Sequence, residues 1–341
     1  MKQHKSLRDQ VVVVTGASSG IGLATARMAA ERGARVVLAA RNGEALARIQ
    51  SEIEAASGRA IHVVADVGRR ADVQAIADRA VAAFGGFDTW VNVAGLTIYG
   101  PLREVTDEDH ARLLQTNLWG TVFGSLVAVE YLKERGGALI NVGSVASDLA
   151  FPFQGMYCAS KHAVKGFTDA LRMELEQDGL PISVTLVKPT SIDTPLPQRA
   201  RNYMDREPTL PPPIYPPEEV AHAILHAAVH PQRDIFVGGG GRVLVGLKEF
   251  APGAYDKLAP AIIAFQQRSE PPRDPEGALR DPVGDGAAKG HQPGFVRRKS
   301  YYTRASLQPA KLNPMKTAGL VGIGLTLAAG LLGRARGGRR L

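Results

Sequence analysis

Short runs of apolar, mostly β-branched residues alternate with longer amphipathic stretches through about residue 237. Near-continuous apolar strands separated by helices are typical of a parallel sheet that is covered on both faces. Because crossover connections are right-handed, the pattern predicts an α/β fold with a doubly wound parallel sheet. The predicted strands are Val11–Thr15, Arg35–Ala39, Ala60–Ala65, Thr89–Asn92, Ala138–Val142, Ser183–Val187 and Asp234–Val237. Helices are expected near residues 19–32, 43–57, 69–84, 107–134, 155–178 and 217–230.

Composition and charge exclude several classes of protein. With 45% apolar and 22% charged residues, the chain is neither disordered, nor a coiled coil, nor a polytopic membrane protein. Residues 1–267 carry 27 Lys/Arg and 28 Asp/Glu, a net of −1, whereas residues 268–341 carry 14 and 5, a net of +9. The basic excess therefore belongs to the tail, and nothing indicates nucleic-acid binding by the body.

The single cysteine and the N-terminus both bear on the compartment. Cys158 cannot form an internal disulfide, which fits a reducing environment. Residues 1–15 hold no apolar stretch of the length that a secretory signal needs. We therefore expect the body to lie in the cytoplasm.

A glycine-rich turn joins the first predicted strand to the first predicted helix. In Thr15-Gly16-Ala17-Ser18-Ser19-Gly20-Ile21-Gly22, Gly16 allows a tight turn, Gly20 a close approach of backbone to a pyrophosphate, and Gly22 close helix packing. The helix N-terminus adds free N–H groups that favour phosphate. A purely structural strand–helix turn is the alternative. The strand before the turn and the helix after it favour a Rossmann-like dinucleotide site made by Gly16, Ser18, Ser19, Gly20, Ile21 and Gly22.

The end of the second predicted strand bears on the choice of dinucleotide. An acidic residue there would bind the ribose 2′-hydroxyl of NAD(H), but the sequence Ala39-Ala40-Arg41-Asn42 has none. A guanidinium can bind a 2′-phosphate with two hydrogen bonds, so Arg41 favours NADP(H) over NAD(H). The alternative is that Arg41 is a solvated residue at a helix start.

Four side chains suggest chemistry on a carbonyl or an alcohol. Tyr157 and Lys161 are four residues apart on one helix face, Ser144 follows the strand ending at Val142, and Asn117 lies in the preceding long helix. With the turn at Thr15–Gly22 and with Asp66-Val67, Asn92-Val93-Ala94-Gly95 and Tyr157-Cys158-Ala159-Ser160-Lys161, the chain resembles the single-domain short-chain dehydrogenase/reductase family. The resemblance covers roughly residues 8–240.

The resemblance implies further cofactor contacts. Asp66 would contact the adenine amino group, Val67 the ring surroundings, and Thr194 the nicotinamide carboxamide. Asn92, Ala94 and Gly95 would shape the wall beside the adenine ribose. The sequence departs from the family at Val93, where a second Asn is usual, and at Thr190, where Gly usually follows Pro189.

The expected chemistry is hydride transfer between nicotinamide and a carbonyl or secondary alcohol. Tyr157 would be the acid/base, with the Lys161 ammonium favouring its phenolate and Ser144 holding the carbonyl oxygen. Asn117 would hold a water that links Lys161 to solvent. Alternatively, Asn117 satisfies buried backbone groups and Ser144 caps a turn. A nucleotide-responsive regulator without turnover, built on the same scaffold, is the competing function.

These readings divide the chain into four segments: an NADP-binding catalytic domain over 8–240, a helical extension over 241–267, a flexible basic linker over 268–316, and an apolar helix with a basic end over 317–341. The linker is indicated by five prolines and five glycines within 271–294. The uncharged run Thr317–Gly333 beside four arginines predicts contact with a membrane surface. The alternative is a helix that packs against the body or against a partner subunit.

The sequence says less about the substrate and about the oligomeric state. Residues 189–217 hold nine of the 22 prolines, so regular structure is not expected there. The family places its substrate lid in this segment, whose apolar residues either line a site for a small-molecule substrate or pack the lid onto the body. They are Leu196, Tyr203, Met204, Leu210, Ile214 and Tyr215. The resemblance also implies a homo-oligomer.

Overall fold

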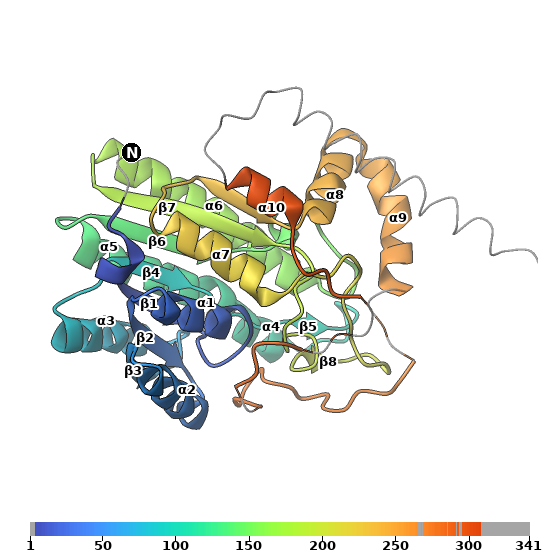
Figure 1. Ribbon diagram of the computed structural model, residues 1–341. Helices are drawn as coiled ribbons and strands as arrows, with labels where there is room; N and C mark the ends of the chain where they lie inside the picture. The colour runs from blue at the N-terminus through green and yellow to red at the C-terminus, as the bar shows by residue number, and fades with distance from the viewer. Residues whose placement is uncertain are drawn as a thin grey trace, which may run out of the picture.

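The computed structural model describes residues 4–264, 267, 269–284, 286–290, 292 and 295–307, and a seven-stranded parallel sheet forms the centre of this part (Figure 1). The strand order is β3-β2-β1-β4-β6-β7-β9, so the chain winds outward in both directions from β1 and β4. The predicted doubly wound α/β fold is confirmed. The strands are β1 Val11–Thr15, β2 Arg35–Ala40, β3 Arg59–Val64, β4 Thr89–Asn92, β6 Gly137–Val142, β7 Ile182–Pro189 and β9 Asp234–Val237.

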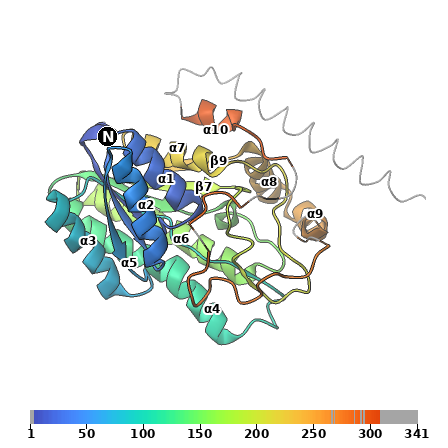
Figure 2. The same cartoon turned by 60° about the horizontal axis from the view of Figure 1, so that its bottom comes forward.

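Two apolar layers form because successive strand residues point to opposite faces of the sheet. Val12 and Val14 of β1 pack with α1, α2 and α7, whereas Val11 and Val13 pack with α3, α5 and α6. Figure 2 shows α1 and α7 on one side of the sheet and α5 and α6 on the other. The helix bounds are α1 Gly20–Glu31, α2 Gly43–Ala55, α3 Arg70–Phe84, α5 Gly120–Leu132, α6 Gly155–Gln177 and α7 Pro217–Ala227.

The helix predicted near 107–134 is interrupted. It consists of α4 Asp107–Leu114 and α5, joined by a π-helical turn at Gln115–Trp119. The side chain of Thr106 caps α4 by accepting a hydrogen bond from the Asp109 amide. Such π turns often occur at functional sites, and this one contains the buried Asn117.

The chain after β9 returns to the carboxyl ends of the strands. Helices α8 Gly239–Phe250 and α9 Pro252–Ala264 occupy the predicted helical extension. The short helix α10 Tyr301–Ser306 packs beside β9, where the Thr303 hydroxyl accepts a hydrogen bond from the Gly238 amide. Residues 189–217 contribute only the short strand β8 Arg201–Asn202, which pairs with β5 Ile98–Tyr99.

The described residues of 268–316 depart from the flexible linker that the composition predicts. Leu279 is only 2% exposed and packs with Leu96 and Leu113 of the body, and Gln292 is also buried. The composition shows correctly that this segment lacks apolar residues for a core of its own. It does not show that the segment packs against the body's core instead.

Residues 308–341, including the apolar segment 317–341 with its predicted membrane contact, lie outside the described residues. Within the described part of the chain, no helix combines the length and the apolar character that crossing a bilayer requires.

Candidate active site

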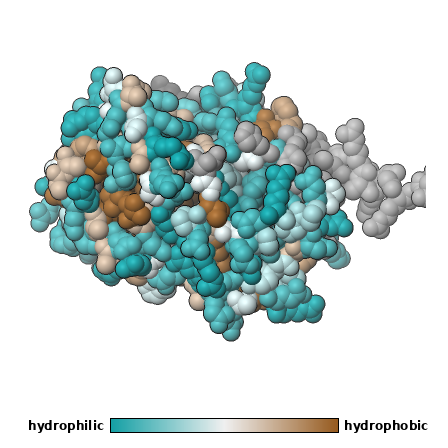
Figure 3. Space-filling view, turned by 90° about the horizontal axis from the view of Figure 1, so that it is seen from below, coloured by the Kyte–Doolittle hydropathy of each residue, from teal (hydrophilic) through white to brown (hydrophobic). Residues whose placement is uncertain are grey.

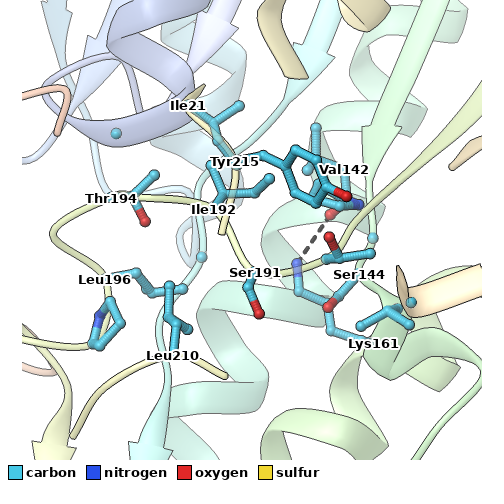
Figure 4. Close-up of a pocket in the computed structure, with 18 of the residues that line it drawn as sticks. Ile21, Val142, Ser144, Lys161, Ser191, Ile192, Thr194, Leu196, Leu210 and Tyr215 are labelled. Carbon is cyan, nitrogen blue, oxygen red and sulfur yellow. Dashed lines mark hydrogen bonds between the residues drawn. The ribbon is translucent and has the colours of Figure 1, made fainter. Parts of the chain in front are cut away.

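A cavity of about 1860 Å³ lies at the carboxyl ends of the strands. It spans the place where the strand order reverses between β1 and β4, which is where open α/β sheets bind ligands. Typical small-molecule pockets measure about 300–1,000 Å³, so this cavity has room for a dinucleotide and a second molecule. Figure 4 shows the residues after β6 and on α6 facing the loop that carries Ser191, Thr194 and Leu196.

The glycine-rich turn forms one wall of this cavity. Gly16 and Gly20 have φ of +69° and +55°, where side chains are strained. A Cβ on Gly22 would lie 2.2 Å from the Gly16 carbonyl oxygen, so the helix can approach the turn only without a side chain there. The N-cap residue of α1, Ser19, makes no side-chain hydrogen bond to the first turn. The first amide of α1, that of Gly20, donates a hydrogen bond to the Ala287 carbonyl, so the amides that follow it in the first turn are the ones available to a phosphate ligand.

Ser144, Tyr157 and Lys161 meet at the opposite wall. The buried Lys161 ammonium donates a hydrogen bond of 2.9 Å to the Val142 carbonyl (Figure 4). The same ammonium nitrogen lies 5.9 Å from the centroid of the Tyr157 ring. The Ser144 hydroxyl acts on the Tyr157 phenol and favours its ionised form, lowering its pKa. It also caps a short 3-10 helix by accepting a hydrogen bond from the Ala146 amide. Turn capping and a place in the site therefore coexist at Ser144.

Burial controls the protonation of this group. Desolvation raises the pKa of Tyr157 to about 12, although the hydrogen bond from Ser144 acts in the opposite direction. Desolvation also lowers the pKa of Lys161 to about 8. Burial is therefore the main influence on the pKa of Tyr157, and the stabilisation of the phenolate by Lys161 stays a prediction. At neutral pH Tyr157 holds its proton and Lys161 is mostly a cation.

Two predicted asparagines lie behind the cavity rather than in its wall. The Asn117 amide donates hydrogen bonds to the Leu96 carbonyl and to the Ser160 hydroxyl, and its oxygen accepts one from the Leu96 amide. Asn117 therefore satisfies buried backbone groups, and the water that it was expected to hold stays a prediction. Asn117 lies behind Gly95, which is part of the cavity wall. A Cβ on Gly95 would be 3.7 Å from the Lys161 ammonium nitrogen.

Asn92 differs from the expectation that it shapes the wall beside the ribose. It is buried, accepts a hydrogen bond from the Trp90 indole and donates one to Asn141. The side chain at the end of β4 points into the helical layer, because residues alternate along a strand. The cavity wall is instead formed by the next three residues, Val93, Ala94 and Gly95.

Arg41 and Asp66 line the end of the cavity that was assigned to adenosine, and Arg112 stands behind Asp66. Asp66 accepts hydrogen bonds from the Gly68 amide and from Arg112, whose guanidinium is 2.6 Å away. This ion pair and Arg41 nearby keep the pKa of Asp66 below its ordinary value, against the effect of burial. Arg41 itself donates hydrogen bonds to the carbonyls of Ala278 and Arg280. It is therefore not the solvated residue of the alternative interpretation.

Some apolar residues of the lid segment, 189–217, line the cavity and others pack the segment onto the body, so both alternatives from the sequence occur. Leu196, Leu210 and Tyr215 line the cavity, as does the buried Thr194. Tyr203 instead packs against the body, where its hydroxyl donates a hydrogen bond to Asp109, and Ile214 is buried.

Sequence reasoning missed two residues of the site. Arg112 comes from α4 and has no spacing relation to Asp66 that would indicate their ion pair. Gln154 lines the cavity, donates a hydrogen bond to the Thr97 hydroxyl and is only 8% exposed. It lies three residues before Tyr157, and that helical spacing is a signal that could have revealed it.

Comparisons with known proteins define the class. A family model described as short chain dehydrogenase matches residues 10–205, and the chain belongs to this family of oxidoreductases. The uncharacterized oxidoreductase YxnA of Bacillus subtilis (strain 168) is 46% identical over 322 residues, which cover 93% of this chain and 90% of that protein.

Two further relatives carry more specific descriptions. A 3beta-hydroxysteroid dehydrogenase of Mediterraneibacter gnavus is 35% identical over 193 residues, 56% of this chain and 69% of that protein. The crystal structure of a short chain dehydrogenase/reductase from Burkholderia phymatum in complex with NAD matches with a TM-score of 0.67 and 29% identity. The match covers 74% of this chain and 96% of that one.

Proposed function

We propose that this chain is an NADP(H)-dependent oxidoreductase that interconverts a carbonyl and a secondary alcohol, with Tyr157 as the acid/base. The observation that carries the proposal is the convergence of Ser144, Tyr157 and Lys161 on a cavity whose other wall is a phosphate-binding turn. The test is to mix the purified chain with NADPH and a panel of carbonyl compounds and to follow NADPH absorbance. Binding without turnover would favour the regulator instead.

Ser144, Tyr157 and Lys161 have different roles in the proposed carbonyl reduction. A nicotinamide cofactor, when bound, would supply the hydride that the carbonyl carbon accepts. The Ser144 hydroxyl donates a hydrogen bond to the carbonyl oxygen, and Tyr157 gives that oxygen its proton as negative charge develops. The raised pKa of Tyr157 keeps this proton in place at neutral pH. The Lys161 cation, held by the Val142 carbonyl, then stabilises the phenolate that remains.

The substrate that fits this site is a large apolar one. Around the catalytic wall, the cavity is lined by Phe151, Leu196, Leu210, Leu244 and Leu247. In a largely apolar pocket, a few polar groups that point to one place fix the orientation of an apolar ligand. The similarity to a 3beta-hydroxysteroid dehydrogenase supports a polycyclic or similarly bulky secondary alcohol as the substrate class.

The cofactor proposal rests on charge at the adenosine end. Arg41 and Arg112 lie there together, with burial and the neighbouring Arg112 lowering the pKa of Arg41. Asp66 and Asp281 are the acids near Arg41, so the preference for a 2′-phosphate over a bare ribose rests on the guanidinium of Arg41, which can bind a phosphate with two hydrogen bonds. The relative from Burkholderia phymatum in complex with NAD supports NAD(H) as the second candidate.

Replacing Arg41 by Ala distinguishes these cofactors. We expect KM for NADPH to rise about tenfold to a hundredfold more than KM for NADH, the size of a lost charge-assisted hydrogen bond, because the hydrogen bonds of Arg41 to residues 278–280 are lost with either cofactor. Steady-state kinetics with both cofactors measure this. Arg103→Ala, on a highly exposed arginine, is the control. Equal effects of Arg41→Ala on both cofactors would mean that Arg41 does not recognise the 2′-phosphate.

We also propose that the chain self-associates through the helical layer of α5 and α6. Figure 3 shows a polar face interrupted by an apolar patch on the side where α3 and α5 lie. Exposed apolar residues of this layer include Trp119 (47%), Leu126 (38%) and Met173 (60%). Burial of such residues between copies is favourable. Light scattering at micromolar concentration is expected to give at least twice the chain mass, and a monomer would contradict this.

A further inference from the structure

A segment of the C-terminal extension runs along the dinucleotide cavity from end to end. We call the described residues 277–284 and 286–290 the strap. At the adenosine end, Arg41 donates hydrogen bonds of 2.5 and 2.6 Å to the strap carbonyls of Ala278 and Arg280. The Asn42 side chain donates another, of 3.1 Å, to Gly284. The strap thus contacts the residues that the sequence assigns to the adenosine phosphate.

The same segment also contacts the phosphate turn and the nicotinamide end. The Gly20 amide donates a hydrogen bond of 3.0 Å to the Ala287 carbonyl. Further on, the Gln198 side chain donates one of 2.9 Å to the Gly290 carbonyl. Gly290 lies so close to the Thr194 carbonyl that a Cβ on it would be 2.1 Å from that oxygen. These contacts follow the full length expected for a bound dinucleotide.

Two side chains dock the strap on the body outside the cavity. Leu279 is almost fully buried against Leu96 and Leu113. Arg280 forms an ion pair of 2.6 Å with the buried carboxylate of Asp109. An apolar anchor and an adjacent ion pair give the strap a defined closed position.

The strap encloses the cavity without filling it. Ala278, Pro282, Val283, Gly284 and Gly286 are among the lining residues of the cavity, whose volume is about 1860 Å³ with the strap in place. This segment lies beyond the part of the chain that the family model matches, residues 10–205. The family model therefore does not describe this wall of the cavity.

We propose that the strap is a clasp for the dinucleotide cofactor, so that the cofactor enters and leaves only when the strap opens. The inference rests on the cofactor site proposed above. Closure slows both binding and release, and it shields the bound dinucleotide from solvent along its length. Arg41 then serves two ligands, the strap carbonyls and the cofactor phosphate.

A disulfide lock tests the clasp. A Cβ on Gly286 would lie 3.5 Å from Cβ of Ala45 on α2, within the range of disulfides. The double variant Gly286→Cys/Ala45→Cys is loaded with NADPH, oxidised with diamide and passed through a desalting column. Because Gly286 has φ +84°, the reduced double variant is the reference for strain. NADPH fluorescence is expected to persist at least tenfold longer in the oxidised form, and reduction should restore release.

The reverse order of addition gives the second arm. When the variant is oxidised before NADPH is added, binding is expected to be at least tenfold slower than in the reduced form. Equal rates in both forms would overturn the clasp. Failure of the disulfide to form in the presence of NADPH would also overturn it, because strap and cofactor would then compete for one space. Absence of NADPH binding in the wild type would instead refute the cofactor proposal itself.

A single substitution of Leu279, the apolar anchor of the strap, tests the clasp without a crosslink. In Leu279→Ala the strap loses its buried contact, and NADPH dissociation, measured by stopped-flow displacement with excess NADP⁺, is expected to be at least tenfold faster. Leu102→Ala, on a leucine that is 58% exposed, is the matched control and should change dissociation less than twofold. An unchanged dissociation rate in Leu279→Ala, with thermal unfolding showing a folded protein, would contradict the clasp.

Discussion

Replacement of Tyr157 by Phe is expected to lower kcat for carbonyl reduction by about 10²–10⁴-fold, the usual contribution of a positioned general acid. The ring keeps its packing, so the change removes only the hydroxyl, whose pKa the neighbouring Ser144 lowers. NADPH affinity should therefore stay within about twofold of the wild type, an estimate based on the loss of one hydroxyl contact. Steady-state kinetics and a fluorescence titration measure the two quantities.

The control for this variant is Tyr131→Phe. The Tyr131 hydroxyl donates a hydrogen bond to Asp78 on the surface and has no place in the cavity. Tyr131→Phe removes the same kind of hydroxyl as Tyr157→Phe but outside the cavity, so the kcat of this control should match that of the wild type. Retention of most activity in Tyr157→Phe would take the acid/base role away from Tyr157.

Replacement of Gly22 by Ala is expected to weaken NADPH binding by at least about a hundredfold, or about 2.7 kcal/mol. The new Cβ would lie 2.2 Å from the Gly16 carbonyl oxygen and 2.7 Å from its carbon, both backbone atoms. The turn and the start of α1 must move apart, which displaces the amides that would bind phosphate. Fluorescence titration with NADPH gives the affinity, and thermal unfolding shows the cost to the fold.

Gly166→Ala is the matched control for that change. Gly166 lies within α6 and its Cβ would meet nothing within 4 Å. Alanine in a helix interior is more stable than glycine by about 0.5–1 kcal/mol, so this variant should unfold at a slightly higher temperature and bind NADPH normally. Equal NADPH affinity in Gly22→Ala and Gly166→Ala would contradict the role of close helix packing in the turn.

Local patterns in the sequence predicted the elements that bear the site. The runs of valine in β1 and β2 indicated buried parallel strands, because a strand covered on both faces needs apolar residues at every position. The glycines at 16 and 22 predicted a turn whose geometry forbids side chains, and the structure shows that steric reason directly. The spacing of Tyr157 and Lys161 predicted one helix face, and both residues lie on α6 beside the cavity.

Interactions between distant segments could not be inferred in this way. Asn92 ends a strand in both the prediction and the structure, but only the register of β4 beside β6 turns its side chain toward Asn141. The ion pair of Asp66 with Arg112 joins two segments 46 positions apart. No periodicity within either segment encodes that pairing.

The sequence by itself determined the strands, the phosphate turn and the family, because short-range periodicity and contiguous motifs specify them. Only the tertiary structure decided where the described residues of 268–316 go. The prolines and glycines within 271–294 predicted a flexible linker there, since such a composition favours an extended, solvated chain. Leu279 instead buries itself in a pocket that the body has already formed, and Arg41 supplies hydrogen bonds from 237 to 239 positions away. Such docking depends on the shape and charge of a surface that exists only once the rest of the chain has folded.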